Sequence, residues 1–411
     1  MQSETILIGV DGGASEVRAH EILTLPRRSL LESPSFGLGA ASASRLYDTA
    51  RNFRPVPLPT QLLAFDRGSV ATDGPQGIER AQARLWVEAA SEVVLAVASE
   101  ARSTRARLGI CMPGLKTRDG RGIAVMKHGP RIPDYLVRLE ELLAKGGLAL
   151  SHPVVRLSSD GEACAHGEEA GAQGSLRGVG CAYYVGGGTG IAEAIKADGR
   201  IHGLDAFRGQ VRKAWQLESG GGKSIEDALS PKGMNAAFAQ VIRRKLPLDA
   251  AEFPERRAAA GDEHAKAVLR RAADALADLV VDRMLALRRG LVAKGAAREG
   301  DPDPALPAGV RIVPNTILDR VVVGQRLGQI LADPAHAEVF RQPCEAALAR
   351  KILETGDGAL RKHYFDGSSL RSDLLVPSLL RAAPAIGAAA IEVLEATGSA
   401  ELSRASAPPP F

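Results

Sequence analysis

Hydrophobic runs that end in glycine-rich turns occur twice in this chain, and each is followed by a second apolar stretch. The first run covers residues 6–10 (ILIGV) and the second covers 182–185 (AYYV). Short continuous apolar runs bounded by glycine predict buried strands. Return strands are therefore expected over 17–23 and 191–195. No short tandem repeat occurs, so the repetition predicts two similar halves of the protein.

Between these strands and others along the chain, apolar residues recur at helical spacing. Ile78, Leu85 and Val93 belong to such a pattern, which predicts a long helix over 77–101. Alternating strands and helices indicate an α/β protein. Further expected elements are strands at 108–111, 154–157 and 321–323, and helices at 134–145, 161–172, 223–245, 263–294 and about 385–397.

Proline- and serine-rich stretches predict where regular structure is interrupted. We expect an irregular insertion at about 25–75, a loop at 301–304 and a disordered tail at 405–411. The expected domain division is 1–160 and 161–404. A chain of 411 residues is long enough for about two domains, each with its own core.

Composition narrows the classes of partner and compartment. The chain is 45% hydrophobic and 24% charged with a net charge of +4, as in ordinary globular proteins. Basic residues are not interleaved with aromatic ones, so a nucleic-acid partner is not expected. The longest apolar stretch, 382–394, contains Pro384 and Glu392 and is too short to cross a bilayer. With no signal peptide and four single cysteines, the sequence predicts a cytoplasmic protein without a membrane partner. These cysteines are Cys111, Cys164, Cys181 and Cys344.

The two glycine turns are candidate phosphate-binding loops. Glycine has no side chain to stand between backbone N–H groups and a polyphosphate. Asp11, at the end of the first strand, is a candidate for orienting Mg²⁺ through water. Plain hairpin turns, with Asp11 capping a β-turn, are the alternative. The candidate nucleotide-binding residues are Asp11, Gly12, Gly13 and Ser15 in the first turn, and Gly187, Gly188, Thr189 and Gly190 in the second.

These segments and others, in this order, resemble the ROK family of bacterial sugar kinases within the actin-like ATPase superfamily. The first turn is similar to the family's DxGGT, with Ser15 for threonine and Glu16 at the usual lysine. Residues 109–114 (GICMPG) resemble its GxxxPG segment. Residues 159–168 (SDGEACAHGE) resemble its NDaNaaalgE block, where Asp160 matches the catalytic aspartate. Two C-terminal segments, 324–328 with Gly324 and Gln325 and 378–390, resemble those near the adenosine.

The resemblance implies a fold of two actin-like ATPase (ribonuclease H-like) domains around a nucleotide cleft, with the last helix packing back on the first domain. It also implies an ATP- and Mg²⁺-dependent kinase that phosphorylates a hydroxyl of a sugar or sugar-like substrate. Asp160 would be the general base that accepts the hydroxyl proton. From the local pattern alone, Asp160 could instead be a helix N-cap. Whether the protein forms a homodimer is a question that the sequence leaves open.

The sequence departs from the family at the substrate end. The family's GExGH motif reads GQVRK over 209–213, which places Gln210 and Lys213 at its sugar-binding glutamate and histidine. Ser159 replaces an asparagine, and Glu226 keeps the next sugar-contacting acid. The zinc-binding cysteine segment is absent, so no zinc is expected. A more positive acceptor pocket would favour a sugar with an acidic group, unless Lys213 simply lies on the surface.

Three other functions are alternatives to the kinase. A catalytically weak nucleotide- or sugar-binding regulator of the same fold is the main alternative, because several substrate positions are altered. A ROK repressor would need a helix-turn-helix domain before the first strand, and an iron–sulfur activator ATPase would need clustered cysteines. Residues 220–224 (GGGKS) lack the earlier glycine and the preceding buried strand that a P-loop requires.

Overall fold

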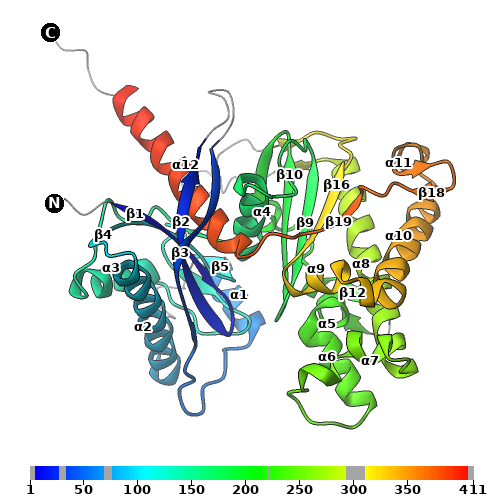
Figure 1. Ribbon diagram of the computed structural model, residues 1–411, viewed down its shortest axis with the longest axis horizontal. Helices are drawn as coiled ribbons and strands as arrows, with labels where there is room; N and C mark the ends of the chain where they lie inside the picture. Colours follow the sequence, from blue (N-terminus) through cyan, green and yellow to red (C-terminus); the bar gives the residue numbers. More distant parts are fainter. Residues whose placement is uncertain (1–4, 27–33, 69–75, 221, 293–310, 406–411) are drawn as a thin grey trace. The chain divides into compact units, whose positions relative to one another are not determined.

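The computed structural model describes residues 5–26, 34–68, 76–220, 222–292 and 311–405. These residues form two compact units, each with its own central sheet (Figure 1). Within the described residues, the first unit comprises 5–26, 34–68, 76–174 and 380–405. The second comprises 175–220, 222–292 and 311–379. The first unit thus extends beyond residue 160 to Gly174 and includes the last helix.

The first unit is built on a mixed sheet with strand order β3-β2-β1-β4-β7, and β8 also pairs with β4. Strands β1, β2 and β3 form an antiparallel meander, whereas β4 runs parallel to β1. The strands are β1 (Ile6–Gly12), β2 (Glu16–Leu25), β3 (Ser35–Leu46), β4 (Arg105–Cys111), β7 (Ala149–Leu150) and β8 (Leu157–Ser158). Around them lie α1 (Leu58–Asp66), α2 (Gly77–Glu100), α3 (Tyr135–Lys145) and a hairpin of β5 (Leu115–Lys116) and β6 (Ile123–Val125).

The two faces of this sheet are covered differently. Ile8 and Val10 of β1 are fully buried in a core shared with α2. The opposite face bears glycines, and α4 (Asp160–Ala170) and α12 (Ala383–Ala405) pack there (Figure 1). A Cβ atom on Gly9 would lie 2.0 Å from the carbonyl oxygen of Ala385. Small residues on β1 and β4 therefore let α12 lie directly against the strands.

Gly109 of β4 provides a test of this close packing. Its substitution by alanine would place a Cβ 2.1 Å from the Ala388 carbonyl oxygen, so α12 must shift. We expect Gly109→Ala to lower the free energy of unfolding by about 1–3 kcal/mol, as overpacked cores do. Urea denaturation measures this change. Gly358→Ala is the matched control, since a Cβ there has no neighbour within 4 Å; an equal effect of both variants would contradict the argument.

The second unit repeats the sheet of the first. Its strand order is β11-β10-β9-β16-β19, again an antiparallel meander extended by strands parallel to its first strand. This shared topology confirms the two similar halves that the sequence predicts. The strands are β9 (Ala182–Gly187), β10 (Ile191–Ala197), β11 (Arg200–Gly203), β16 (Arg320–Gly324) and β19 (Leu375–Pro377).

Helices and short hairpins complete the second unit, and α8 supplies a large share of its core residues. The helices are α5 (Ile225–Leu229), α6 (Pro231–Val241), α7 (Pro254–Ala259), α8 (Glu263–Arg289), α9 (Gln325–Ala332), α10 (Gln342–Glu354) and α11 (Gly358–Tyr364). The short strands pair as β12 (Glu218–Ser219) with β13 (Lys223–Ser224), β14 (Leu291–Val292) with β15 (Arg311–Ile312), and β17 (Phe365–Asp366) with β18 (Ser369–Leu370).

Most of the expected elements are present, with corrections. The helix expected over 263–294 ends at Arg289 and β14 follows, and the stretch 223–245 contains β13, α5 and α6. The long helix at 77–101 and the strands of both glycine turns are confirmed. The described part of 25–75 is not irregular, because it holds β3 and α1. Small residues along β3 hide its alternation, yet Phe36 and Ala41 are buried. The loop at 301–304 and residues 406–411 of the tail lie outside the described residues. None of the described helices is both long and apolar enough to cross a bilayer.

Candidate active site

The first unit brings Asp11 and Asp160 to the same edge of its sheet. Asp11 pairs laterally with Cys111 at the carboxyl end of β4, and Cys111 pairs with Ser158 of β8. These strands are parallel, so their carboxyl ends meet at one edge. The chain leaves β8 and enters α4 at Asp160, two residues after Ser158. The negative charge of Asp160 also acts on Asp11 and raises its pKa. Sequence reasoning predicted both residues, and the register explains why they meet.

Ser159, not Asp160, is the N-cap of α4. The Ser159 hydroxyl accepts a hydrogen bond from the Glu162 N–H at 3.2 Å. This contact is the usual way to satisfy a free N–H group at a helix start. Asp160 is the first helical residue, and its Oδ1 accepts from the Gly161 N–H at 3.0 Å. The N-cap interpretation of Asp160 is therefore wrong, and the predicted substrate residue Ser159 has a structural role.

Asp11 has an unusual ionisation. Burial raises the pKa of its carboxyl to about 6, and the charges of Asp160 and Glu16 act in the same direction. Arg18 and a contact with the Cys111 thiol oppose the rise. The Cys111 Sγ lies 3.9 Å from the Asp11 Oδ1. A buried carboxyl group whose pKa is raised toward 7 and that lies beside a second carboxyl group is typical of functional sites. Such an arrangement does not stabilise the fold.

This raised pKa predicts that Asp11→Asn stabilises the protein. The ordinary pKa of 3.8 describes the unfolded chain, so the folded state loses stability as the pH rises from about 4 to about 6, and the full loss is present above 6. We expect Asp11→Asn to raise the free energy of unfolding by about 3 kcal/mol at about pH 8. The gain should shrink as the pH falls through 6 and vanish near 4. Urea denaturation of both proteins across this range measures it, and a gain independent of pH would contradict the assignment.

The first glycine turn leaves no space for a side chain at Gly12. A Cβ on Gly12 would lie 1.9 Å from the Met112 sulfur. The Gly13 N–H donates to the Glu16 carbonyl at 2.9 Å, which closes the turn between β1 and β2. Ser15 is exposed, and its carbonyl accepts from the Tyr47 N–H at 3.0 Å. The predicted residues Asp11, Gly12, Gly13 and Ser15 are thus together at the same edge as Asp160.

The second glycine turn joins β9 to β10 in the second unit. The Gly188 N–H donates to the Gly190 carbonyl at 3.0 Å across the turn. The buried Glu226 supports it from α5, because its Oε2 accepts from the Ile191 N–H at 3.1 Å. A Cβ on Gly190 would lie 2.9 Å from that same oxygen. Glu226, predicted as a sugar contact, therefore supports the turn that also contains Gly187 and Thr189.

Gln325 lies beside this turn, directly after the neighbouring strand β16. Gly187 and Gln325 form a parallel bridge at the end of β16. The backbone of Gln325 is left-handed, with φ of 58°, which is uncommon for a residue with a side chain. A Cβ on Gly324 would lie 2.1 Å from the Tyr184 hydroxyl. The structure thus gathers the second turn, Gly324 and Gln325 in the second unit, although the sequence places them 134 or more residues apart.

Gln210 and Lys213 are held in contacts with their own surroundings. The Gln210 amide oxygen accepts from the Val292 N–H at 3.0 Å, and its amide nitrogen donates to the Val292 carbonyl. The Lys213 Nζ lies 2.6 Å from the Asp205 Oδ1. Asp205 therefore neutralises the positive charge of Lys213, on which the expectation of a more positive acceptor pocket depends. The structure therefore gives no support to a preference for acidic sugars, and Gln210 is a link between its loop and β14.

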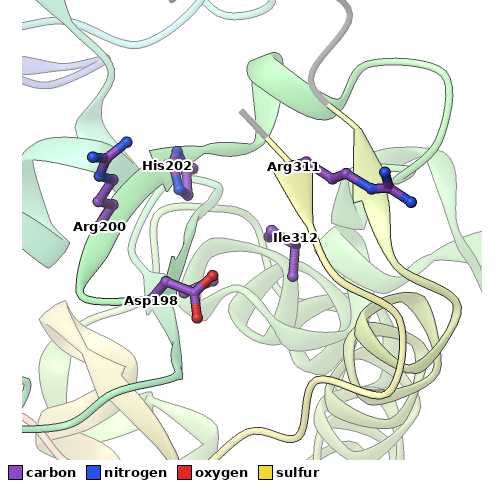
Figure 2. A pocket seen from close by; sticks show the side chains of 6 residues that line it. Asp198, Arg200, His202, Arg311 and Ile312 are labelled. Atoms are coloured by element: carbon purple, nitrogen blue, oxygen red, sulfur yellow. The ribbon is translucent and has the colours of Figure 1, made fainter. Parts of the chain in front are cut away.

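The contacts of Lys223 and Ser224 argue against a P-loop at 220–224. Lys223 pairs with Ser219 in the β12–β13 hairpin, and Ser224 caps α5 by accepting from the Asp227 N–H at 3.1 Å. A cavity of about 250 Å³ opens elsewhere in the second unit, beside the turn between β10 and β11. Figure 2 shows Asp198 between β11, which bears Arg200 and His202, and β15. This cavity adjoins the end of β10 opposite to the second glycine turn, so it is separate from the candidate site.

Sequence reasoning missed Cys111, Met112 and Arg18 as neighbours of Asp11. Cys111 and Met112 could have been suspected, since they end the strand that is parallel to β1. Arg18 is two residues beyond the family motif and is found only through the strand register. Among the described residues, no group of three or more histidine, cysteine, aspartate or glutamate side chains could hold a metal ion.

Each unit, with its antiparallel meander, added parallel strands and packed helices, has the actin-like ATPase type of architecture. The fold of the whole chain is that of the ROK sugar kinases. It is similar to the ROK hexokinase from Thermus thermophilus, with a TM-score of 0.52 and 16% identity over 96% of this chain and 100% of that one. It is also similar to a ROK family glucokinase from Streptomyces griseus, solved with glucose and AMPPNP, with a TM-score of 0.53 and 13% identity over 94% and 98% of the two chains. Neither a protein-family model nor a curated protein matches the sequence.

Proposed function

We propose that this protein is a kinase that transfers a phosphoryl group from ATP to a hydroxyl of a sugar or sugar-like compound. The pair of carboxyl groups, Asp11 and Asp160, at one edge of the first sheet carries the proposal. Asp11 directly precedes a glycine turn, and Asp160 begins a helix. The fold is shared with sugar kinases. In such a fold, one carboxyl group could position the phosphates through Mg²⁺ while the other accepts the proton of the hydroxyl.

Asp160 is proposed as the general base. It accepts the proton of the attacking hydroxyl, a role that is worth about 10²–10⁴-fold in rate. Its place in the first turn of α4 leaves the capping to Ser159, so the carboxylate is not needed to start the helix. Asp11 would bind Mg²⁺ through water. Mg²⁺ commonly takes one or two carboxylates plus substrate phosphates, so this small donor set fits it. The bound metal would neutralise charge on the transferred phosphoryl group.

The second unit would contribute nucleotide contacts. Thr189 and the N–H groups of 187–190 are proposed to bind phosphate, because glycines leave the backbone accessible. Gly324 and Gln325, beside that turn, are proposed to contact the adenosine side. The strained backbone at Gln325 supports a functional role, since such strain is concentrated at ligand sites.

An acceptor panel tests the activity. The protein is incubated with Mg²⁺-ATP and neutral, amino, acidic and phosphorylated sugars, while ADP release and phosphorylated product are both measured. We expect ADP release that depends on one class of acceptor and stops when EDTA removes the metal. ADP release that no acceptor increases, together with no phosphorylated product, would contradict the kinase.

A regulator of the same fold is the second candidate, and the contacts of Gln210 and Lys213 favour it. Both residues stand at sugar-binding positions of the family, yet here they link their loop to Val292 and Asp205. A protein that binds nucleotide and sugar without turnover fits that arrangement. Calorimetric binding of nucleotide and sugar, with no product after long incubation, would select this candidate over the kinase.

A further inference from the structure

The first glycine turn of the first unit is lined with acidic groups. The charges of Glu16 and Asp160 both act on Asp11 there, and carboxylates repel the phosphates of a nucleotide. Like charges that act on one another cost free energy unless cations offset them. A bound divalent metal would supply two positive charges. The turn therefore needs a further cation of its own to hold a triphosphate, and Arg18 is the cation closest to it in register.

Arg18 lies directly opposite Asp11. The two residues are lateral partners in the antiparallel pair of β1 and β2, so their side chains emerge on the same face. Glu16, two residues earlier on β2, shares that face because side chains alternate along a strand. The Arg18 Nη2 lies 2.6 Å from the Glu16 Oε2. An arginine is thus held at the mouth of the turn by the residue that replaces a lysine in the family motif.

The ion pair of Arg18 with Glu16 can be exchanged. The Arg18 side chain is 55% exposed, and exposed pairs are worth about 0–1 kcal/mol. A guanidinium binds phosphate oxygens through two parallel hydrogen bonds, which is a stronger contact than an exposed carboxylate offers. Arg18 can therefore leave Glu16 when an anion with several charges arrives.

We propose that Arg18 is the phosphate-binding cation of the first glycine turn. Its guanidinium pairs with Glu16 in the free protein and binds the terminal phosphates of the nucleotide instead when the nucleotide is bound. The proposal rests on the nucleotide binding put forward above. It assigns Glu16 a role as well: the glutamate positions the guanidinium in the free protein and competes with the phosphates for it.

Calorimetry with AMP, ADP and AMPPNP in the presence of Mg²⁺ tests the proposal without requiring turnover. We expect Arg18→Met to weaken AMPPNP and ADP binding about tenfold and to leave AMP unchanged, with Arg18→Lys in between. Arg45→Met is the matched control. Arg45 lies on the neighbouring strand opposite Val17, so its side chain emerges on the other face, and it pairs with Asp48 at 2.8 Å. Equal binding of AMPPNP by wild type and Arg18→Met would overturn the proposal alone, whereas no nucleotide binding by the wild type would overturn the proposed function with it.

A double-mutant cycle separates this role from a merely structural ion pair. Glu16→Gln should strengthen AMPPNP binding a few-fold, because the guanidinium no longer has to leave a carboxylate. The gain should disappear when Arg18→Met is also present, since the two residues would act as a unit. A gain that persists without Arg18 would mean that Glu16 acts only by repulsion, and this outcome would also overturn the proposal.

Discussion

Replacing Asp160 with asparagine should reduce kcat by about 10²–10⁴-fold while affinity for Mg²⁺-nucleotide changes little. Asparagine keeps the shape of the side chain and its place in α4, but it cannot accept the hydroxyl proton. The helix itself should be unaffected, because Ser159 supplies the capping hydrogen bond to Glu162. Steady-state rates of ADP release with the acceptor found in the panel, together with calorimetric nucleotide affinities, measure the two effects separately.

Glu141→Gln is the control for this variant. Glu141 is an exposed carboxylate of α3 in the same unit, and it should leave kcat and affinity unchanged. A fall in kcat of less than about tenfold for Asp160→Asn would contradict the general-base role, because base removal costs far more. A joint loss of kcat and nucleotide affinity would indicate that Asp160 holds the nucleotide instead.

The two glycine turns, and the helix that begins at Asp160, could be predicted because their signals are local in sequence. An apolar run before Gly12 and Gly13, or before residues 186–190, shows a strand that ends in a turn, and both are present. The N-cap alternative for Asp160 is wrong because Ser159 takes that place; both are good capping residues, and the sequence alone does not show which side chain faces the helix start. Strand β3 was missed because alanine, serine and glycine are neutral to weak strand formers.

The contacts of Gln210 could not be predicted, because its partner is distant in sequence. The partner of Gln210 is Val292, 82 residues further along. The role proposed for Arg18 could not be predicted from the sequence either. Its importance depends on the lateral register of β1 and β2, and a shift of one residue would place it on the other face of the sheet.

The interior of the second unit contains a charged pair that fixes the loop before β12. Arg283 of α8 is fully buried, and its Nη2 lies 2.5 Å from the Oε1 of Glu193 on β10. The other oxygen of Glu193 accepts from the Ala214 N–H at 2.9 Å, and Arg283 donates to the Arg212 carbonyl at 2.7 Å. The Tyr183 hydroxyl also donates to Glu193, at 2.7 Å. One ion pair therefore connects the sheet, the long helix and the loop.

Arg283→Met should lower the free energy of unfolding of the protein by about 3–5 kcal/mol, because it leaves the Glu193 carboxylate buried without its countercharge. Urea denaturation followed by circular dichroism measures the loss. Arg350→Met is the matched control: that arginine is 52% exposed in its pairs with Asp274 and Glu354, so it should cost less than about 1 kcal/mol. Adding Glu193→Leu to Arg283→Met should restore part of the loss, since the uncompensated charge is then gone. A double variant that is less stable than Arg283→Met would show that Glu193 acts mainly through Tyr183 and Ala214, and that the ion pair is not what stabilises this core.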